Sequence, residues 1–218
     1  SVLRVDERIT DENGGTIHAL NDVEQRGIIV TNGTATLRHD GSVIERLLIT
    51  GQISGPGGIT VANGSGQVWL RGTQSNVQEG PTFVLCKLRL DNSAGNAIAG
   101  DLTIQSSGSV RLDRDHQLHD SSTVTILGTG ALLANEREDT FHALRMQGGL
   151  LDGNRLDLVD FLARTPVYRN FFEDETLSRF QVNQLEATSS SSTTSAQILD
   201  ARVFLTSATG AAVVTDGP

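Results

Sequence analysis

Apolar residues along this chain recur in short alternating runs and not at the spacing of a helix. Gly27–Val30, Thr34–Leu37 and Val43–Ile49 are runs of this kind, and Asn32-Gly33 is one of the turn signals between them. Asn and Gly mark turns because they tolerate positive φ at little cost. Short strands separated by tight turns, without a period near 3.6 residues, indicate an all-β chain.

An internal repeat lies between Leu102 and Gly149. Leu102-Thr103-Ile104 aligns with Val124-Thr125-Ile126 and Val110 aligns with Leu132, each at an offset of 22 residues. Self-similarity at a fixed period is typical of stacked repeats, in which one unit cannot bury its apolar face alone. The repeat predicts a parallel β-helix, or β-solenoid, with rungs of about 22 residues spaced about 4.8 Å apart.

The same rhythm divides the chain into two expected regions. We predict a parallel β-helix over residues 1–165, opening with a strand at Ser1–Asp6, and a less regular cap or linker over residues 166–218. Within the β-helix, Phe83–Leu90 is expected to be one strand. Ile53–Gly58 is expected to be a turn, and Arg71–Pro81 a polar excursion.

The C-terminal region has a different texture. Apolar residues spaced by about three and four predict a short helix over residues 171–180, which would shield the last rung as a cap. Ser189–Ser195 is a flexible loop or linker by composition. Ile198–Leu205 and Ala211–Val214 are expected to be late strands, forming another rung or the start of a following module.

Several segments resemble the autotransporter-associated β-strand repeat. Ile53–Thr60 is similar to its SGxGGLxK opening, while Gly66–Gly72 and Leu85–Asn92 look like its GxLxLxG and TVxxGTLxLxN strands. Residues 97–104 and 120–126 are similar to its spacer strands, and Val77–Pro81 departs from its usual Tyr-Thr-Gly-Gly turn. The resemblance covers about residues 50 to 153. It implies a right-handed, single-stranded parallel β-helix of the autotransporter passenger type, exported to the bacterial surface.

Composition and charge narrow the class of partner. The formal net charge is −9 and Lys87 is the one lysine, which disfavours nucleic acid because phosphate binding needs clustered basic residues. No apolar run approaches the roughly 20 residues that span a bilayer. The chain opens as a strand and not as a signal peptide, which indicates a mature protein or an internal piece. The single cysteine, Cys86, excludes an intrachain disulfide, and we expect a small buried hydrophobe there.

Two groups of residues are candidate cation sites. His116 and His119 lie beside Asp113, Asp115 and Asp120, and imidazole with carboxylate oxygens suits zinc or a related ion. A solvated turn is the favoured alternative, because three-residue spacing brings ligands together best on a helix. The second group, which offers oxygens to calcium, is Asp152, Asn154 and Asp157. It lacks the glycine and distal Glu of an EF-hand loop, so charged turns are favoured there too.

An enzyme is the rival class of function. β-helix enzymes that act on polysaccharides place carboxylates on one outer face. The acids that might cluster in this way are Asp113, Asp115, Glu136, Glu138 and Asp139. Under the 22-residue offset Asp115 lies over Arg137, and one such pair is not a catalytic dyad. A carbohydrate-active enzyme or a tailspike-like polysaccharide depolymerase therefore stays the alternative.

The remaining signals are weaker. Gly55–Gly58 lacks the Lys and Ser/Thr of a phosphate-binding loop and is read as a plain turn. Asn32 and Asn63 open glycosylation sequons, which matter only in a glycosylating secretory pathway. Trp69 is expected in the core and not as a sugar platform.

Taken together, the patterns predict an extracellular structural solenoid. It would serve as a stalk, an adhesin or a filament subunit, with no catalytic residues, bound metal or cofactor. The expected partners are further copies, associated end to end through strand edges at Val2–Val5 and Val203–Val214, or a glycan or other component of a cell surface.

Overall fold

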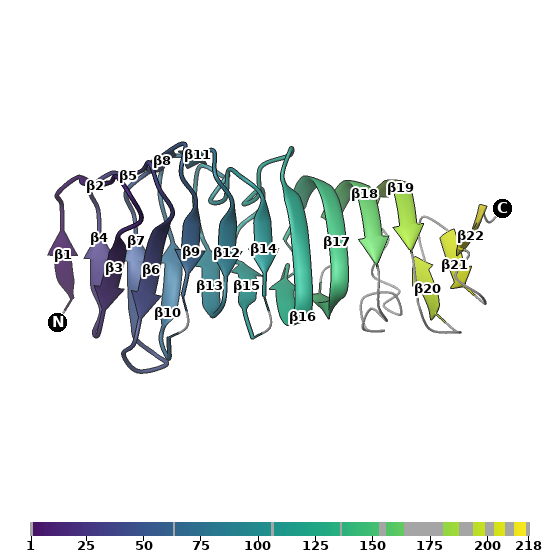
Figure 1. The fold of residues 1–218 in the computed structure, drawn as a ribbon, viewed down its shortest axis with the longest axis horizontal. Helices are drawn as coiled ribbons and strands as arrows, with labels where there is room; N and C mark the ends of the chain where they lie inside the picture. The colour runs from purple at the N-terminus through teal and green to yellow at the C-terminus, as the bar shows by residue number, and fades with distance from the viewer. Residues whose placement is uncertain are drawn as a thin grey trace.

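The chain folds as a stack of short parallel strands wound into a solenoid (Figure 1). The computed structural model describes residues 2–152 apart from 63, 106 and 136, and the segments 156–163, 181–187, 194–198, 203–207 and 212–216. About seven turns of about 21 residues follow one another along the long axis of the molecule. The described residues form no helix, and the predicted all-β parallel solenoid is confirmed.

The first four turns each contribute one strand to each of three parallel stacks, and the first and third stacks continue into later turns. The first stack contains β1 (Leu3–Val5), β4 (Val23–Gln25), β7 (Arg46–Ile49), β10 (Gln67–Leu70), β13 (Lys87–Leu90) and β15 (Ser109–Leu112). The second contains β2 (Ile9–Asp11), β5 (Ile29–Thr31), β8 (Ile53–Gly55) and β11 (Val77–Gln78). The third contains β3 (Thr16–Ala19), β6 (Ala35–His39), β9 (Ile59–Val61), β12 (Thr82–Val84) and β14 (Leu102–Ile104).

Longer strands follow. The next three along the chain are β16 (Thr123–Leu133), β17 (Asp139–Asp152) and β18 (Leu156–Ala163). β16 pairs with β14 through its first half and with β15 through its second half, so it joins the first and third stacks. β19 (Gln181–Ala187) continues the parallel pairing on β18. The last three strands, β20 (Thr194–Ile198), β21 (Val203–Ser207) and β22 (Ala212–Asp216), pair antiparallel with one another.

The core is a set of apolar columns inside the solenoid. In the first stack Leu47, Val68, Leu88, Val110 and Leu132 lie in register on successive turns and are buried. Parallel strands align side chains directly above one another, so each column excludes water over its whole length. The repeat detected in the sequence is this register, with Leu102 on Val124 and Val110 on Leu132.

Some corners bring the backbones of adjacent turns unusually close together. A Cβ atom built on Gly57 would overlap the carbonyl oxygen of Gly33, one turn away, and a Cβ on Gly51 would overlap that of Gly27. Neither glycine has a positive φ, so it is the close approach that requires glycine at both positions. The glycine residues that marked turns in the sequence thus also set the spacing between turns.

Three local predictions were wrong. Phe83–Leu90 is not one strand, because the chain bends at Leu85-Cys86 between β12 and β13 while the apolar alternation continues through the corner. The expected turn at Ile53–Gly58 begins with β8, and the polar excursion Arg71–Pro81 contains β11. The predicted helix over residues 171–180 lies outside the described residues, as does the predicted loop at Ser189–Ser195 up to residue 193, and its last two residues begin β20. The division at residue 165 stays a prediction.

Candidate functional site: a basic outer face

Basic side chains gather on the outer side of the first stack. The paired strands place Trp69 beside Arg89 and Arg89 beside Arg111 on three successive turns. The preceding residue on each strand, Val68, Leu88 or Val110, points inward and is buried. Trp69, Arg89 and Arg111 therefore point outward. We call this surface, from β7 to the second half of β16 together with the corner that follows each strand, the basic face.

Trp69 lies between two arginines. The guanidinium carbons of Arg89 and Arg46 lie 3.9 Å and 4.8 Å from its ring centroid, at the distance of a cation–π contact. Its indole N–H also donates to the side-chain oxygen of Gln67 at 3.1 Å. The prediction that Trp69 belongs to the core was therefore wrong. Trp69 lies one residue from each of the inward-pointing Val68 and Leu70, and it points outward because successive strand residues point to opposite sides.

Asp113 links two turns of the basic face. Its two carboxylate oxygens accept from the Nε atoms of Arg89 at 2.6 Å and Arg111 at 2.9 Å. The Asp113 side chain is only 12% exposed, whereas Arg111 is 46% exposed. Because half-exposed ion pairs contribute about 0–1 kcal/mol to stability, the main consequence is orientation of the two guanidinium groups.

Asp91, which follows β13 one turn before Asp113, also holds two arginines. It accepts from Arg114 Nε at 2.6 Å and lies 3.1 Å from Arg71 Nε, so it joins residues of three successive turns. Arg71 and Arg114 remain 51% and 49% exposed. Each contact is made through Nε, and a guanidinium carries four further N–H donors on its two terminal nitrogens. The arginines are thus fixed in place and keep donors for a second acceptor.

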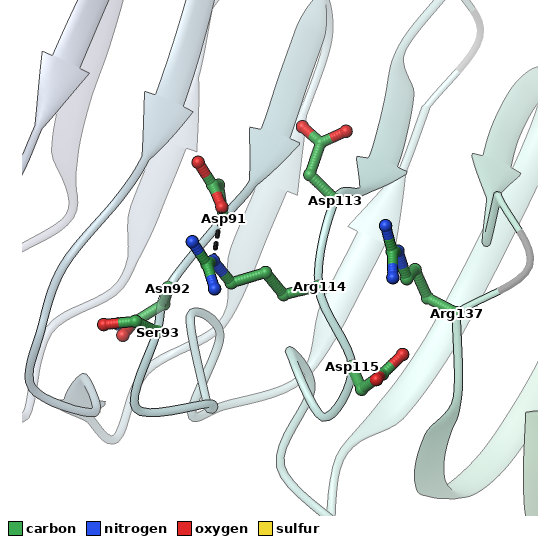
Figure 2. Close-up of a pocket in the computed structure, with 7 residues that line it drawn as sticks. All are labelled: Asp91, Asn92, Ser93, Asp113, Arg114, Asp115 and Arg137. Atoms are coloured by element: carbon green, nitrogen blue, oxygen red, sulfur yellow. Dashed lines mark hydrogen bonds and ion pairs between the residues drawn. The ribbon is translucent and has the colours of Figure 1, made fainter.

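A groove of about 450 Å³ runs along this corner (Figure 2). Its lining consists of Asp91, Asn92, Ser93, Asp113, Arg114, Asp115 and Arg137. Figure 2 shows Arg114 reaching back toward Asp91, and Arg137 entering from the following turn beside Asp115. No ion pair to a described carboxylate holds Arg137. The groove therefore presents one paired and one unpaired arginine among several oxygen acceptors.

The structure describes four of the five acids proposed for an enzyme site. Asp113 and Asp115 line the groove, but Asp113 is held by two arginines and Asp115 accepts the backbone N–H of Glu138 at 3.0 Å. Asp139 lies inside the solenoid, and Glu136 lies outside the described residues. Glycoside hydrolysis needs two carboxyl groups facing one bond, one of them protonated. Of the described members, Asp113 and Asp115 lie in the groove, whereas Asp139 is buried away from solvent.

Asp139 binds backbone N–H groups inside the solenoid. Its carboxylate accepts the backbone N–H groups of Gln117 at 2.8 Å, Leu118 at 3.1 Å and Thr140 at 2.9 Å, and its exposed fraction is 0%. Burial raises the pKa of Asp139 to about 7 against the opposing effect of these three donors, and Asp120 adds a further rise. A carboxyl with this pKa suits a general acid, but here no substrate can reach it.

The zinc site considered at His116 and His119 is not formed by the described residues. His119 Nδ1 pairs with the hydroxyl of Ser121 at 2.8 Å, and His116 lies in a corner with φ of 55°. No group of three or more His, Cys, Asp or Glu is placed to hold a metal ion in the part of the chain that the structure describes. The calcium candidates Asp152, Asn154 and Asp157 fall where side chains are not described.

The single-residue predictions can also be placed. Cys86 is buried as expected, at 7% exposure, and burial raises the pKa of its thiol. Asn32 is exposed and donates to Glu12 at 3.1 Å, whereas Asn63 lies outside the described residues. Gly55 has a φ of 107°, at the end of β8 where the expected turn begins. A helix long and apolar enough to cross a membrane is not found in the described part.

Sequence reasoning missed the basic face, although one signal was present. Arg89 and Arg111 are separated by the same 22 residues as the apolar repeat, and extending the offset to polar positions would have stacked them. Arg71, Asp91 and Arg114 lie in corners of unequal length, so only the structure brings them together.

Comparison with known proteins does not identify the chain. No family model, no curated protein and no solved structure matches it. The strand pairing of this chain establishes the parallel solenoid without a relative. Membership of the autotransporter-associated repeat family stays a proposal.

Proposed function

We propose that this chain is a structural and adhesive solenoid segment of a secreted or surface-exposed bacterial protein. The supporting observation is the parallel pairing of strands over about seven turns. Stacked turns resist bending because each turn is hydrogen-bonded to the next through its paired strands and packs on it through the core. The outer faces then carry side chains at a regular spacing of about 4.8 Å, which suits a binding surface.

The extracellular setting rests on the resemblance to autotransporter passengers and on the surface chemistry. Outward positions are largely polar or charged, and the one cysteine is buried at a corner with a raised pKa, which makes it a poor nucleophile. Nothing in this arrangement requires a metal, a cofactor or a disulfide. The proposed role is mechanical extension combined with contact at a surface.

Turnover of a polysaccharide would contradict this role. We expect no release of new chain ends when the purified protein is incubated with a panel of neutral and acidic polysaccharides, measured by reducing-end and unsaturated-product assays. The reason is that Asp91, Asp113 and Asp115, the acids that line the groove, are engaged by arginines or backbone. Turnover lost in the Asp113→Asn or Glu138→Gln variant would instead establish the enzyme.

Self-association end to end is a second part of the proposal. β1, β2 and β3 are the end strands of their stacks among the described residues, and Val2 and Leu3 are 44% and 63% exposed. Strand edges of this kind accept another strand. We expect small-angle scattering at rising concentration to show rods that lengthen, because copies stack through the first turn. The Leu3→Lys variant should stay a single rod, and an unchanging length for both proteins would exclude stacking through this edge.

A further inference from the structure

The basic face carries a charge opposite to that of the rest of the chain. Its described residues lie in the ranges 46–50, 67–75, 87–95, 109–116, 131–135 and 137–138, which hold seven of the 17 basic and four of the 26 acidic residues. The remainder of a chain with net charge −9 is thus strongly acidic. A local excess of positive charge on an acidic protein attracts an anionic partner to one face and repels it from the others.

The arginines on this face are already oriented. Asp91 and Asp113 each hold two guanidinium groups, and the guanidinium of Arg89 has a second contact with the ring of Trp69. A rigid guanidinium loses little conformational entropy when it binds, and its terminal N–H groups match a carboxylate in a two-point contact. The ion pairs therefore prepare the face for a carboxylate without using up its donors.

The groove also offers acceptors for hydroxyl groups. Asp91, Asp113 and Asp115 line it beside Arg114 and Arg137, so acidic and basic groups alternate along its length. A densely charged polymer would meet repulsion from these three carboxylates. A polymer whose carboxylates are separated by hydroxyls would pair its carboxylates with arginine, and its hydroxyl groups would donate hydrogen bonds to aspartate.

Nucleic acid fits this surface less well. Binding of single strands uses aromatic rings on which bases stack. The ring of Trp69 is already contacted by the guanidinium groups of Arg46 and Arg89. The alternation of Asp with Arg likewise opposes a phosphate at every unit. We propose that the basic face binds an acidic polysaccharide built of uronic acids, lying in the groove between Arg114 and Arg137.

This inference rests on the proposed adhesive function and names its ligand class. The test uses polygalacturonate as the probe, immobilised on a sensor, at low ionic strength. We expect reversible binding that weakens as salt is added, because exposed charges are screened. Replacing Arg114 and Arg137 together by glutamine should weaken binding by about tenfold for each arginine, since each supplies a charge-assisted hydrogen bond.

Arg38→Gln is the matched control. Arg38 is 47% exposed and pairs through Nε with Asp40 at 2.7 Å, as Arg114 does with Asp91, but it lies on the third stack. Its variant should bind polygalacturonate like the parent protein. Circular dichroism of the Arg114/Arg137 variant checks that the fold is kept, and Arg137→Gln alone tests the groove without breaking an ion pair.

Four outcomes would overturn the inference. These are no binding of polygalacturonate, equal binding by the parent and the Arg114/Arg137 variant, equally tight binding of neutral dextran, and tighter binding of single-stranded DNA of matched charge. The mechanical part of the proposed function does not depend on this ligand, because scattering measures the rod shape separately. A rod that fails to bind polygalacturonate would leave the structural role and remove the ligand class.

Discussion

The Gly57→Ala variant is expected to lose about 3 kcal/mol of unfolding free energy, the largest effect of any methyl addition considered in this chain. Gly57 donates its N–H to Thr31 O at 2.7 Å and accepts the Thr31 hydroxyl at 3.0 Å. These bonds hold its backbone against the preceding turn, where an added Cβ would overlap the carbonyl oxygen of Gly33. Urea unfolding followed by circular dichroism measures the loss.

Gly72→Ala provides the comparison. The nearest atom to a Cβ at Gly72 is Asn92 Nδ2 at 3.1 Å, which belongs to a side chain and not to the backbone of a neighbouring turn. We expect this variant to lose less than about 1 kcal/mol. Equal losses for the two variants would contradict the close approach of turns as the cause at Gly57, because the entropic effect of replacing Gly by Ala is common to both positions and is stabilising.

The second large effect is a fall in stability with rising pH that depends on Asp139. Its carboxyl is protonated in the folded protein up to pH about 7 but ionises near its ordinary pKa of 3.8 when the chain unfolds. The unfolded state therefore binds fewer protons between these two values, and the stabilising contribution present at low pH is lost as pH rises. The expected slope is about −1.4 kcal/mol per pH unit across this range.

Asp139→Asn isolates this contribution, because other carboxylates also titrate. Asparagine keeps one oxygen for the N–H groups of Gln117 and Leu118 and cannot ionise. The difference in stability between the parent protein and the variant should therefore shrink from pH 4 to pH 7 by the slope above. Asp101→Asn is the control, since exposed Asp101 accepts the Thr123 N–H at 2.8 Å in the same way. A pH-independent difference for Asp139→Asn would mean that its carboxyl stays ionised inside the solenoid.

Removal of the Asp139 carboxyl group should lower the stability more than its replacement by an amide. Asp139→Ala leaves three backbone N–H groups without their acceptor, two of them from the preceding turn, at about 1–3 kcal/mol each when buried. The loss should exceed that of Asp139→Asn at pH 5. The Asp139 carboxylate thus accepts the N–H groups of Gln117 and Leu118, which in a regular parallel pair would be bonded to backbone carbonyls of the next turn.

The sequence alone determined the architecture of this protein. The 22-residue offset between Leu102 and Val124 is the register of the parallel strands, and the alternating apolar positions became the inward columns. These features are readable because side-chain direction in a strand has a period of two, and because stacking in register repeats the same burial on each turn. Cys86 was placed correctly for the same reason.

Only the tertiary structure decided where the chemistry lies. The alternation of apolar and polar residues continues through the bend at Leu85-Cys86, so it could not reveal the corner. Trp69 was assigned to the core because of its residue type, although its position in the strand points it outward. Asp139 and Asp113 look alike in sequence, yet one caps backbone donors in the interior and the other orients two arginines outside. Corners of unequal length, with paired strands offset by 17 to 24 residues, set which side chains meet, and such offsets arise from the packing of whole turns.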